Sequence, residues 1–143
     1  MTSRLIFVLE NDPVRIGAMR ESLESSMLAG SATFIDNAPD AVAWLSRNLG
    51  RCGVISLDHD LGGEQMRDGC SFDPGSGRDI ANYLAERTPV CPVLLHTDNF
   101  FVRPGIISVL ESGSWKHSFV SPGNGIAWVS REWLPQIIRL LGD

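Results

Sequence analysis

Short, mostly apolar runs, each followed by a polar or acidic cluster, constrain the fold of this chain more than any other sequence feature. Three such runs are Leu5–Leu9, Cys52–Leu57 and Val90–Leu95. Runs of this length that do not alternate with polar residues are typical of strands covered on both faces of a parallel sheet. They therefore predict central strands with helices packed on each side.

Segments with helical spacing separate the apolar runs. Residues 13–27 repeat apolar side chains at helical intervals, and Asp12 followed by Pro13 is a helix-start signal. A last helix falls within residues 130–141, where Pro135 makes the start uncertain because proline fits only the first turn. Further helices are predicted at 37–49, 78–87 and 105–112, and further strands at 32–35 and 114–120. Strand and helix thus alternate five times, which predicts an α/β fold with one doubly wound, five-stranded parallel sheet.

The length of 143 residues is that of one domain, and no internal repeat divides the chain. We therefore expect a single domain over residues 1–143. Residues 62–77 contain five glycines and show no periodicity. This stretch predicts a mobile loop inserted after the third strand.

Composition excludes several classes of function. The net charge of −5 disfavours binding to duplex DNA, whose partners normally present a basic face. No apolar run approaches the ~20 residues of a membrane-spanning helix, and the first residues do not form a signal peptide. The three cysteines are widely spaced without a CxxC motif, which indicates reduced thiols and a cytoplasmic location.

Polar clusters follow three of the predicted strands, at residues 10–12, 58–60 and 96–99. The carboxyl ends of parallel strands meet at one edge of a sheet, where ligands bind. Carboxylates crowded there repel one another, and a bound cation or raised pKa values relieve that repulsion. Oxygen ligands favour a hard cation such as Mg²⁺, which in turn can neutralise a phosphate group.

Each polar residue at this edge also has a simpler interpretation. Asp12 fits a helix cap, Asp60 fits a turn, and Asp98 with Asn99 fits a loop. His96 could equally be a hydrogen-bonded core residue. Asp58, by contrast, directly follows a buried strand, where a carboxylate indicates function.

The motifs at these strand ends resemble, in order and position, those of response-regulator receiver domains with the CheY-like fold. The matching strings are Leu9-Glu10-Asn11-Asp12-Pro13, Ile55-Ser56-Leu57-Asp58, Leu94-Leu95-His96-Thr97 and Val120-Ser121-Pro122. The resemblance implies that Glu10 and Asn11 hold Mg²⁺, that Asp58 accepts a phosphoryl group, and that the backbone carbonyl of Asp60 reaches the metal. It also implies that Thr97 binds a phosphoryl oxygen.

Two departures from the receiver pattern argue against an ordinary phosphotransfer switch. Asn11 stands where receivers have a metal-binding acid, and Ser121 stands where they have a lysine. A narrower resemblance fits better. The string Ser56-Leu57-Asp58-His59-Asp60-Leu61-Gly62 and the pattern His96-Thr97-x-Asn99 are similar to the cyclic-phosphate processing receiver domains, which implies activity on cyclic phosphate in nucleotides or at RNA ends.

These arguments predict a site at the carboxyl edge of the sheet that opens a cyclic phosphodiester. The expected catalytic residues are Asp58, His59 and His96; the expected substrate-binding residues are Thr97 and Asn99; the expected ligands of a weakly held Mg²⁺ or Mn²⁺ are Glu10, Asn11, Asp58 and Asp60. Adjacent strand residues point to opposite faces, so Asp58 and His59 share a site only if the chain turns there.

The alternative function is that of a non-catalytic or atypical receiver. In that case Asp58 accepts a phosphoryl group, or the domain binds a protein partner through its last helix. Exposure of Trp128, Trp133 and Leu134 would provide such a surface, although packing in the core is the simpler role for these side chains.

Overall fold

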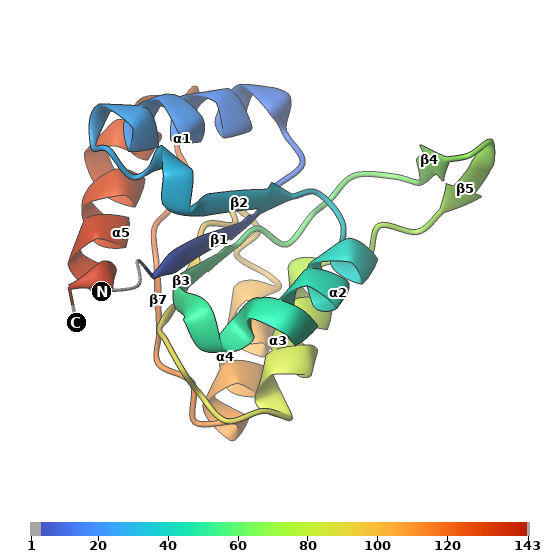
Figure 1. The fold of residues 1–143 in the computed structure, drawn as a ribbon. Coiled ribbons are helices and arrows are strands. Elements are labelled where there is room, and N and C mark those ends of the chain that lie inside the picture. Colours follow the sequence, from blue (N-terminus) through green and yellow to red (C-terminus); the bar gives the residue numbers. More distant parts are fainter. Residues whose placement is uncertain (1–3, 143) are drawn as a thin grey trace.

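The structure is a computed structural model that describes residues 4–142. Its centre is a five-stranded parallel sheet in the order β2-β1-β3-β6-β7 (Figure 1). The strands are β1 (Leu5–Leu9), β2 (Ala32–Ile35), β3 (Cys52–Leu57), β6 (Val93–Leu95) and β7 (His117–Phe119). This arrangement confirms the predicted α/β fold with one doubly wound sheet.

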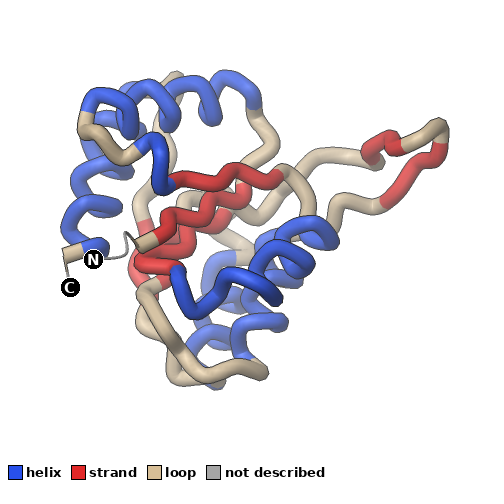
Figure 2. The backbone as a smooth tube through the Cα atoms, viewed as in Figure 1, coloured by secondary structure: helices blue, strands red, loops and turns tan. Residues whose placement is uncertain are grey.

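Helices cover both faces of the sheet. They are α1 (Pro13–Ser25), α2 (Ala38–Asn48), α3 (Gly77–Ala85), α4 (Arg103–Ser112) and α5 (Leu134–Leu141), with short 3₁₀ turns at Ala29–Ser31 and Leu49–Arg51. Helices α1 and α5 lie on one face, and α2, α3 and α4 lie on the other (Figures 1 and 2). No helix within residues 4–142 is both long and apolar enough to cross a membrane.

The core is divided into two layers by the alternation of side chains along β1. Phe7 and Leu9 pack toward α2, α3 and α4, whereas Ile6 and Val8 pack with residues of α1 and α5. All four side chains are buried. A strand covered on both faces explains why this run is continuously apolar.

The first helix begins as the sequence predicts. The Asp12 carboxylate accepts the backbone N–H of Val14 at 2.9 Å, and Pro13 occupies the first turn. A side-chain oxygen in this position satisfies a backbone donor that has no partner within the helix. The prediction that Asp12 caps a helix is confirmed.

Residues 62–77 are not the irregular loop that the glycine content predicts. They contain an antiparallel hairpin, β4 (Gln65–Arg67) and β5 (Cys70–Phe72), which projects from the body of the domain (Figure 1). Asp68 and Gly69 form its turn with φ values of 52° and 79°. Asp-Gly is the preferred pair for a two-residue hairpin turn, because both residues tolerate positive φ. Arg67 binds the Asp40 carboxylate on α2 and so anchors the hairpin.

The start of the last helix, which Pro135 leaves open in the sequence, lies before this proline: Pro135 is in the first turn of α5, and helical structure precedes α5. A π-helical turn, Val129–Trp133, runs directly into α5. The backbone N–H of Leu134 bonds to the Val129 carbonyl, five residues earlier. Such wide turns accommodate irregularities within a helix. Trp128 and Trp133 are buried, so the proposed partner surface of exposed tryptophans is wrong.

Candidate functional site

The predicted site residues lie where β1, β3 and β6 end. Backbone hydrogen bonds continue the sheet pairing one residue beyond β3 and β6: Asp58 N–H donates to Leu9 O at 3.0 Å, and His96 N–H donates to Leu57 O at 2.9 Å. Alternation therefore also continues. Asp58 and His96 follow the direction of Ser56 and Leu94, toward α1 and α5.

Glu10 is a fully buried carboxylate whose Oε2 accepts hydrogen bonds and whose Oε1 lies near two basic side chains without a hydrogen bond of its own. Its Oε2 accepts the backbone N–H groups of Asn11 at 3.0 Å and Asp12 at 3.1 Å. Its Oε1 lies 3.2 Å from His96 Nε2 and 3.7 Å from the Arg15 guanidinium. Burial by itself raises the pKa of Glu10, but the nearby His96, with the Asp12 N–H and Arg15, lowers it overall. Glu10 is therefore held as an anion.

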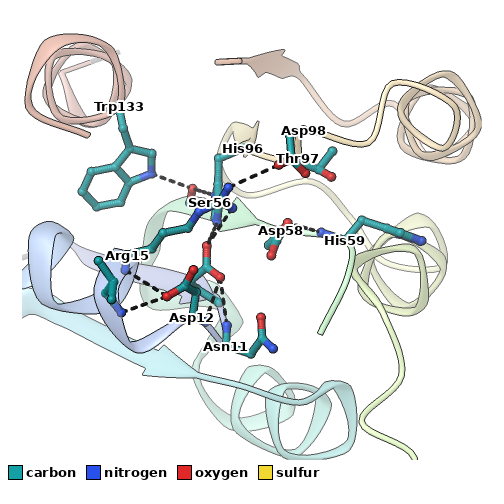
Figure 3. Close-up of polar contacts among 12 residues, drawn as sticks. Asn11, Asp12, Arg15, Ser56, Asp58, His59, His96, Thr97, Asp98 and Trp133 are labelled. Atoms are coloured by element: carbon teal, nitrogen blue, oxygen red, sulfur yellow. Dashed lines mark hydrogen bonds and ion pairs between the residues drawn. The ribbon is translucent and has the colours of Figure 1, made fainter. Parts of the chain in front are cut away.

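His96 is also fully buried, and protein groups face both of its ring nitrogens (Figure 3). The Ser56 hydroxyl lies 2.7 Å from Nδ1, and the Trp133 indole N–H donates to that hydroxyl at 3.0 Å. The ring also stacks on Trp128, with centroids 6.2 Å apart. A hydroxyl proton donated to Nδ1 leaves the ring proton on Nε2, which faces Glu10. His96 is thus placed to hold Glu10 and does not reach solvent.

Asp58 contrasts with Glu10 because it is buried without a cationic partner of its own. It is 5% exposed, and its Oδ1 accepts the His59 backbone N–H at 2.8 Å. Burial, followed by repulsion from the Glu10 carboxylate, raises the pKa of Asp58 to about 8. The pair consequently carries a single negative charge near neutral pH, with Glu10 ionised and Asp58 protonated.

The imidazole of His59 points away from the Asp58 carboxylate (Figure 3). Its Nε2 lies 4.0 Å from Asp60 Oδ1, and its buried Nδ1 has no hydrogen-bond partner. The backbone here is held against α3, since Gly77 N–H donates to His59 O at 3.1 Å. A side chain at Gly77 would collide with the Asp58 carbonyl, whose oxygen is 2.0 Å from an ideal Cβ position. The chain turn that would bring His59 beside Asp58 is therefore absent.

Thr97 and Asn99 form a hydrogen-bonded loop after β6. Thr97 Oγ1 accepts the Asn99 backbone N–H at 3.1 Å, and Asn99 Oδ1 accepts the Phe101 backbone N–H at 3.2 Å. The Asn99 amide also donates to Asp60 Oδ2 at 3.3 Å. Asn99 thus has a structural role in shaping this loop, and it connects the ends of β6 and β3.

The predicted metal ligands do not form a ready-made metal centre. In the described part of the chain, no three His, Cys, Asp or Glu side chains surround a common position for an ion. Protein groups already lie beside both oxygens of Glu10, and Asp60 is exposed and bonded to Asn99. Asp58 is the one carboxylate of the set without a charged partner or a side-chain donor. This donor set does not fit a firmly held Mg²⁺, which relies on carboxylate oxygens.

Sequence reasoning did not identify several residues that shape this edge. Ser56 carried a signal, because it is the one hydroxyl residue in the apolar run of β3. Arg15 sits in the first turn of a predicted helix and could have been placed beside Glu10. Trp133 and Arg103 lie far away in the sequence, and no local pattern connects them to the site.

Residues 14–112 match the family described as the cyclic-phosphate processing receiver domain. The chain belongs to this family. The match includes Asp58, His59 and His96 and ends before β7. Comparison with curated proteins found no match.

Solved response regulators share the fold of this receiver-type domain. The phosphorylated cyanobacterial phytochrome response regulator RcpA superposes with a TM-score of 0.74 at 15% identity, covering 98% of this chain and 95% of that chain. The Mn²⁺-bound response regulator Rcp1 gives 0.65 at 13% identity, covering 94% and 88%. A receiver domain from Rhodospirillum rubrum gives 0.62 at 13% identity, covering 93% and 89%. At these identities the likeness establishes the fold alone.

Proposed function

We propose that this receiver-type domain binds a cyclic phosphodiester at the carboxyl edge of its sheet and opens the ring by hydrolysis. The observation that carries this proposal is the buried Asp58–Glu10 pair. Glu10 accepts two backbone N–H groups and lies 3.2 Å from His96 and 3.7 Å from Arg15, whereas Asp58 accepts one backbone N–H and forms no ion pair. Two neighbouring carboxyls whose surroundings separate their protonation states are a common way to obtain an acid that works near neutral pH.

In the proposed reaction one water is consumed and one ring P–O bond is broken. The water oxygen forms a bond to phosphorus, and its proton passes to a base. The ring oxygen leaves phosphorus and takes the proton of Asp58, so that the product is a phosphate monoester with a free hydroxyl. The raised pKa of Asp58 supports its part, because the carboxyl keeps a proton to about pH 8.

We assign the base to His59, which requires that its ring, directed away from the Asp58 carboxylate in this structure, turns toward the substrate when it binds. Its side chain is 15% exposed, and its Nδ1 has no hydrogen-bond partner. His96 is fully buried, so we assign it the role of a positioning residue that acts through Glu10. Thr97 and Asn99 remain the proposed contacts for phosphoryl oxygens, with the loop after β6 supplying backbone groups. The substrate we propose is a cyclic nucleotide or a cyclic-phosphate RNA end.

A divalent cation has a secondary place in this proposal. The response regulator Rcp1 has been solved with Mn²⁺, and the present chain shares its fold. Here we propose only weak binding of Mg²⁺ or Mn²⁺ at Asp58, assisted by neutral oxygens from Asn11 and the Asp60 backbone. No step of the reaction is assigned to the cation.

The proposal is tested by assaying purified protein on 2′,3′- and 3′,5′-cyclic nucleotides and on RNA ending in a cyclic phosphate. His59→Ala should lower turnover by ~10²–10⁴-fold, the usual loss for one positioned acid or base. His117→Ala is the matched control, because His117 bonds Glu111 at 3.0 Å on an exposed surface away from this edge. Equal losses in both variants would contradict a catalytic role for His59.

The pH dependence of turnover tests the role of Asp58. Turnover that needs a protonated Asp58 should fall as the pH rises past about 8, the raised pKa of this carboxyl. Asp58→Asn should abolish most turnover together with this alkaline decline. Absence of turnover on every substrate, combined with labelling of Asp58 by acetyl phosphate, would overturn the proposal in favour of a phosphoacceptor.

A further inference from the structure

A second buried charge lies at this edge of the sheet, in the first residue of α4. Arg103 is 8% exposed. One terminal nitrogen donates to Thr97 O at 3.3 Å and to Ser121 Oγ at 3.5 Å. The guanidinium carbon lies 4.8 Å from the ring centre of Phe100 and 4.1 Å from that of Phe119. Arg103 therefore connects the end of β6 with the segment that follows β7.

The charge of Arg103 is not neutralised within the described residues. No carboxylate in residues 4–142 forms an ion pair with it, and its buried Nε has no hydrogen-bond partner. Its contacts are two neutral oxygens and two aromatic rings. Buried charges in proteins are normally paired, because an unpaired charge loses its hydration without compensation. Cation–π contacts recover only part of that loss.

We propose that Arg103, with Thr97 and Ser121, forms a binding site for a phosphoryl anion. The two phenylalanine rings contact the guanidinium, and its Nε is buried without a partner, so a phosphoryl oxygen approaches beside the terminal nitrogen that donates to Ser121 Oγ. A planar guanidinium matches a phosphate in a two-point contact. Ser121 is exposed, so a ligand reaching its hydroxyl from solvent arrives beside the Arg103 terminus.

The occupant we favour is the phosphate group of a nucleotide. Phe100, whose ring contacts the guanidinium, is 62% exposed, and the next residue, Phe101, is 98% exposed, so aromatic rings are available beside the site. Bases stack on such faces with little dependence on sequence. The choice of a phosphoryl anion rests on the proposed function, whereas the unpaired cation is an observation that stands without it. Thr97 belongs both to the proposed cyclic-phosphate site and to the Arg103 site, since it directly follows His96 and its backbone carbonyl accepts a hydrogen bond from Arg103.

The site is tested with inorganic phosphate as the probe, by thermal unfolding at constant ionic strength set with chloride. Phosphate at about ten times its Kd should raise the Tm of the wild type by roughly 3–5 °C. Arg103→Met should abolish this Tm shift. Arg103→Lys should reduce it, because lysine keeps the positive charge but lacks the paired N–H donors of a guanidinium. Arg87→Met is the matched control, because Arg87 also contacts an aromatic ring: its guanidinium carbon lies 3.5 Å from the centre of the Tyr83 ring, just after the end of α3.

Unfolding in urea without phosphate separates a ligand site from a structural role. Removing an unpaired buried cation should leave the stability of Arg103→Met equal to that of the wild type or higher. Two results together would overturn the proposal: Arg103→Met and Arg103→Lys both lose much of their free energy of unfolding, and phosphate still raises the Tm of Arg103→Lys as much as that of the wild type. If Arg103→Met does not fold, Arg103→Lys and Ser121→Ala decide the outcome, and both must weaken the shift.

Two further measurements distinguish this inference from the proposed function. An equal Tm shift with acetate would show a carboxylate site and overturn the phosphoryl assignment. Phosphate binding that depends on Arg103, without turnover of any cyclic phosphate, would support the site while contradicting hydrolysis. The site would be overturned, and hydrolysis left intact, if phosphate does not raise the Tm of the wild type and Arg103→Met changes neither the KM nor the kcat of turnover.

Stacking is checked with Phe101→Ala, which should weaken binding of adenosine monophosphate but not of phosphate.

Discussion

Two buried charges at the same sheet edge, Glu10 and Arg103, are accommodated in opposite ways. Glu10 receives two backbone N–H groups, His96 and Arg15, and its anionic form is stabilised. Arg103 has neutral oxygens and aromatic rings as partners and retains an unpaired N–H. Each group leaves one buried atom without a hydrogen bond, Glu10 Oε1 and Arg103 Nε. The difference is in charge: Glu10 has basic side chains beside it, whereas Arg103 has no anionic partner within the described residues.

The comparison also explains the state of Asp58. Because Arg15 and His96 lie beside Glu10, Asp58 stands next to a fixed negative charge and is compensated only by one backbone N–H and by the charge of Arg15. The fold thus stabilises one carboxylate at the expense of its neighbour. A charge satisfied by the fold indicates a structural role, and a charge left unsatisfied at the same edge indicates chemistry or binding.

The largest predicted effect is on the pH dependence of stability in Asp58→Asn. The pKa of Asp58 is about 8 in the native state, above the ~3.9 of an unfolded aspartate. Between these two pKa values the native state holds a proton that the unfolded state has released, so stability falls with rising pH from about 4, and the loss is complete once the pH passes about 8. At 1.36 kcal/mol per unit the loss reaches at most about 5–6 kcal/mol. Asp58→Asn lacks this loss and should gain stability relative to the wild type as the pH rises.

Urea unfolding at pH 5, 7 and 9 measures this difference. Asp98→Asn is the control, because Asp98 is an exposed carboxylate that follows the same strand and contacts Arg15. Stability curves of wild type and Asp58→Asn that stay parallel from pH 5 to pH 9 would show that Asp58 titrates normally. The argument for an acid at this position would then have no basis.

The second effect concerns the network that satisfies Glu10. His96→Ala removes one partner of a buried carboxylate, and such losses typically cost about 3–5 kcal/mol of folding free energy. Ser56→Ala should cost less, about 1–2 kcal/mol, because it leaves the His96–Glu10 contact in place. The free energy of unfolding in urea checks both values. The comparison between the two charges fails if Arg103→Met proves as destabilising as His96→Ala.

Much of this architecture was predictable from the sequence because the responsible patterns are local. The apolar run of β1 has the predicted bounds, and strand alternation alone separates Asp58 from His59. The start of β6 was predicted three residues too early, since Pro92 cannot donate to the sheet and the strand starts at Val93. The hairpin at Asp68-Gly69 was predictable but was hidden by the glycine content around it.

Other features could not be predicted, because they depend on which segments the fold brings together. Trp133 reaches Ser56 across 77 residues, and Arg103 reaches Ser121 from the start of another helix. The buried position of His96 was one of two open interpretations, and only the contacts with Ser56, Trp128 and Glu10 decide between them. Charge satisfaction is a property of the folded arrangement rather than of spacing along the chain.

The smallest predicted effect is weak binding of Mg²⁺ or Mn²⁺, which sharpens the comparison at Glu10. A cation at this edge has Asp58 as its main acidic ligand, because Oε2 of Glu10 accepts two backbone N–H groups, Oε1 lies beside His96 and Arg15, and Asn11 is neutral. The cation must also displace the proton that the raised pKa of about 8 leaves on Asp58, which weakens binding further. Each missing anionic ligand lowers the attraction for a hard cation. Calorimetry should therefore show weak binding by the wild type, none by Asp58→Asn, and unchanged binding by Asp98→Asn.

Arg15→Gln removes a competing positive charge, because the Arg15 guanidinium lies 3.7 Å from Glu10 Oε1. This variant should bind the cation severalfold more strongly. Tight binding by the wild type would show that Glu10 gives up its protein partners to a metal, and the view of Glu10 as a charge satisfied by the fold would be wrong.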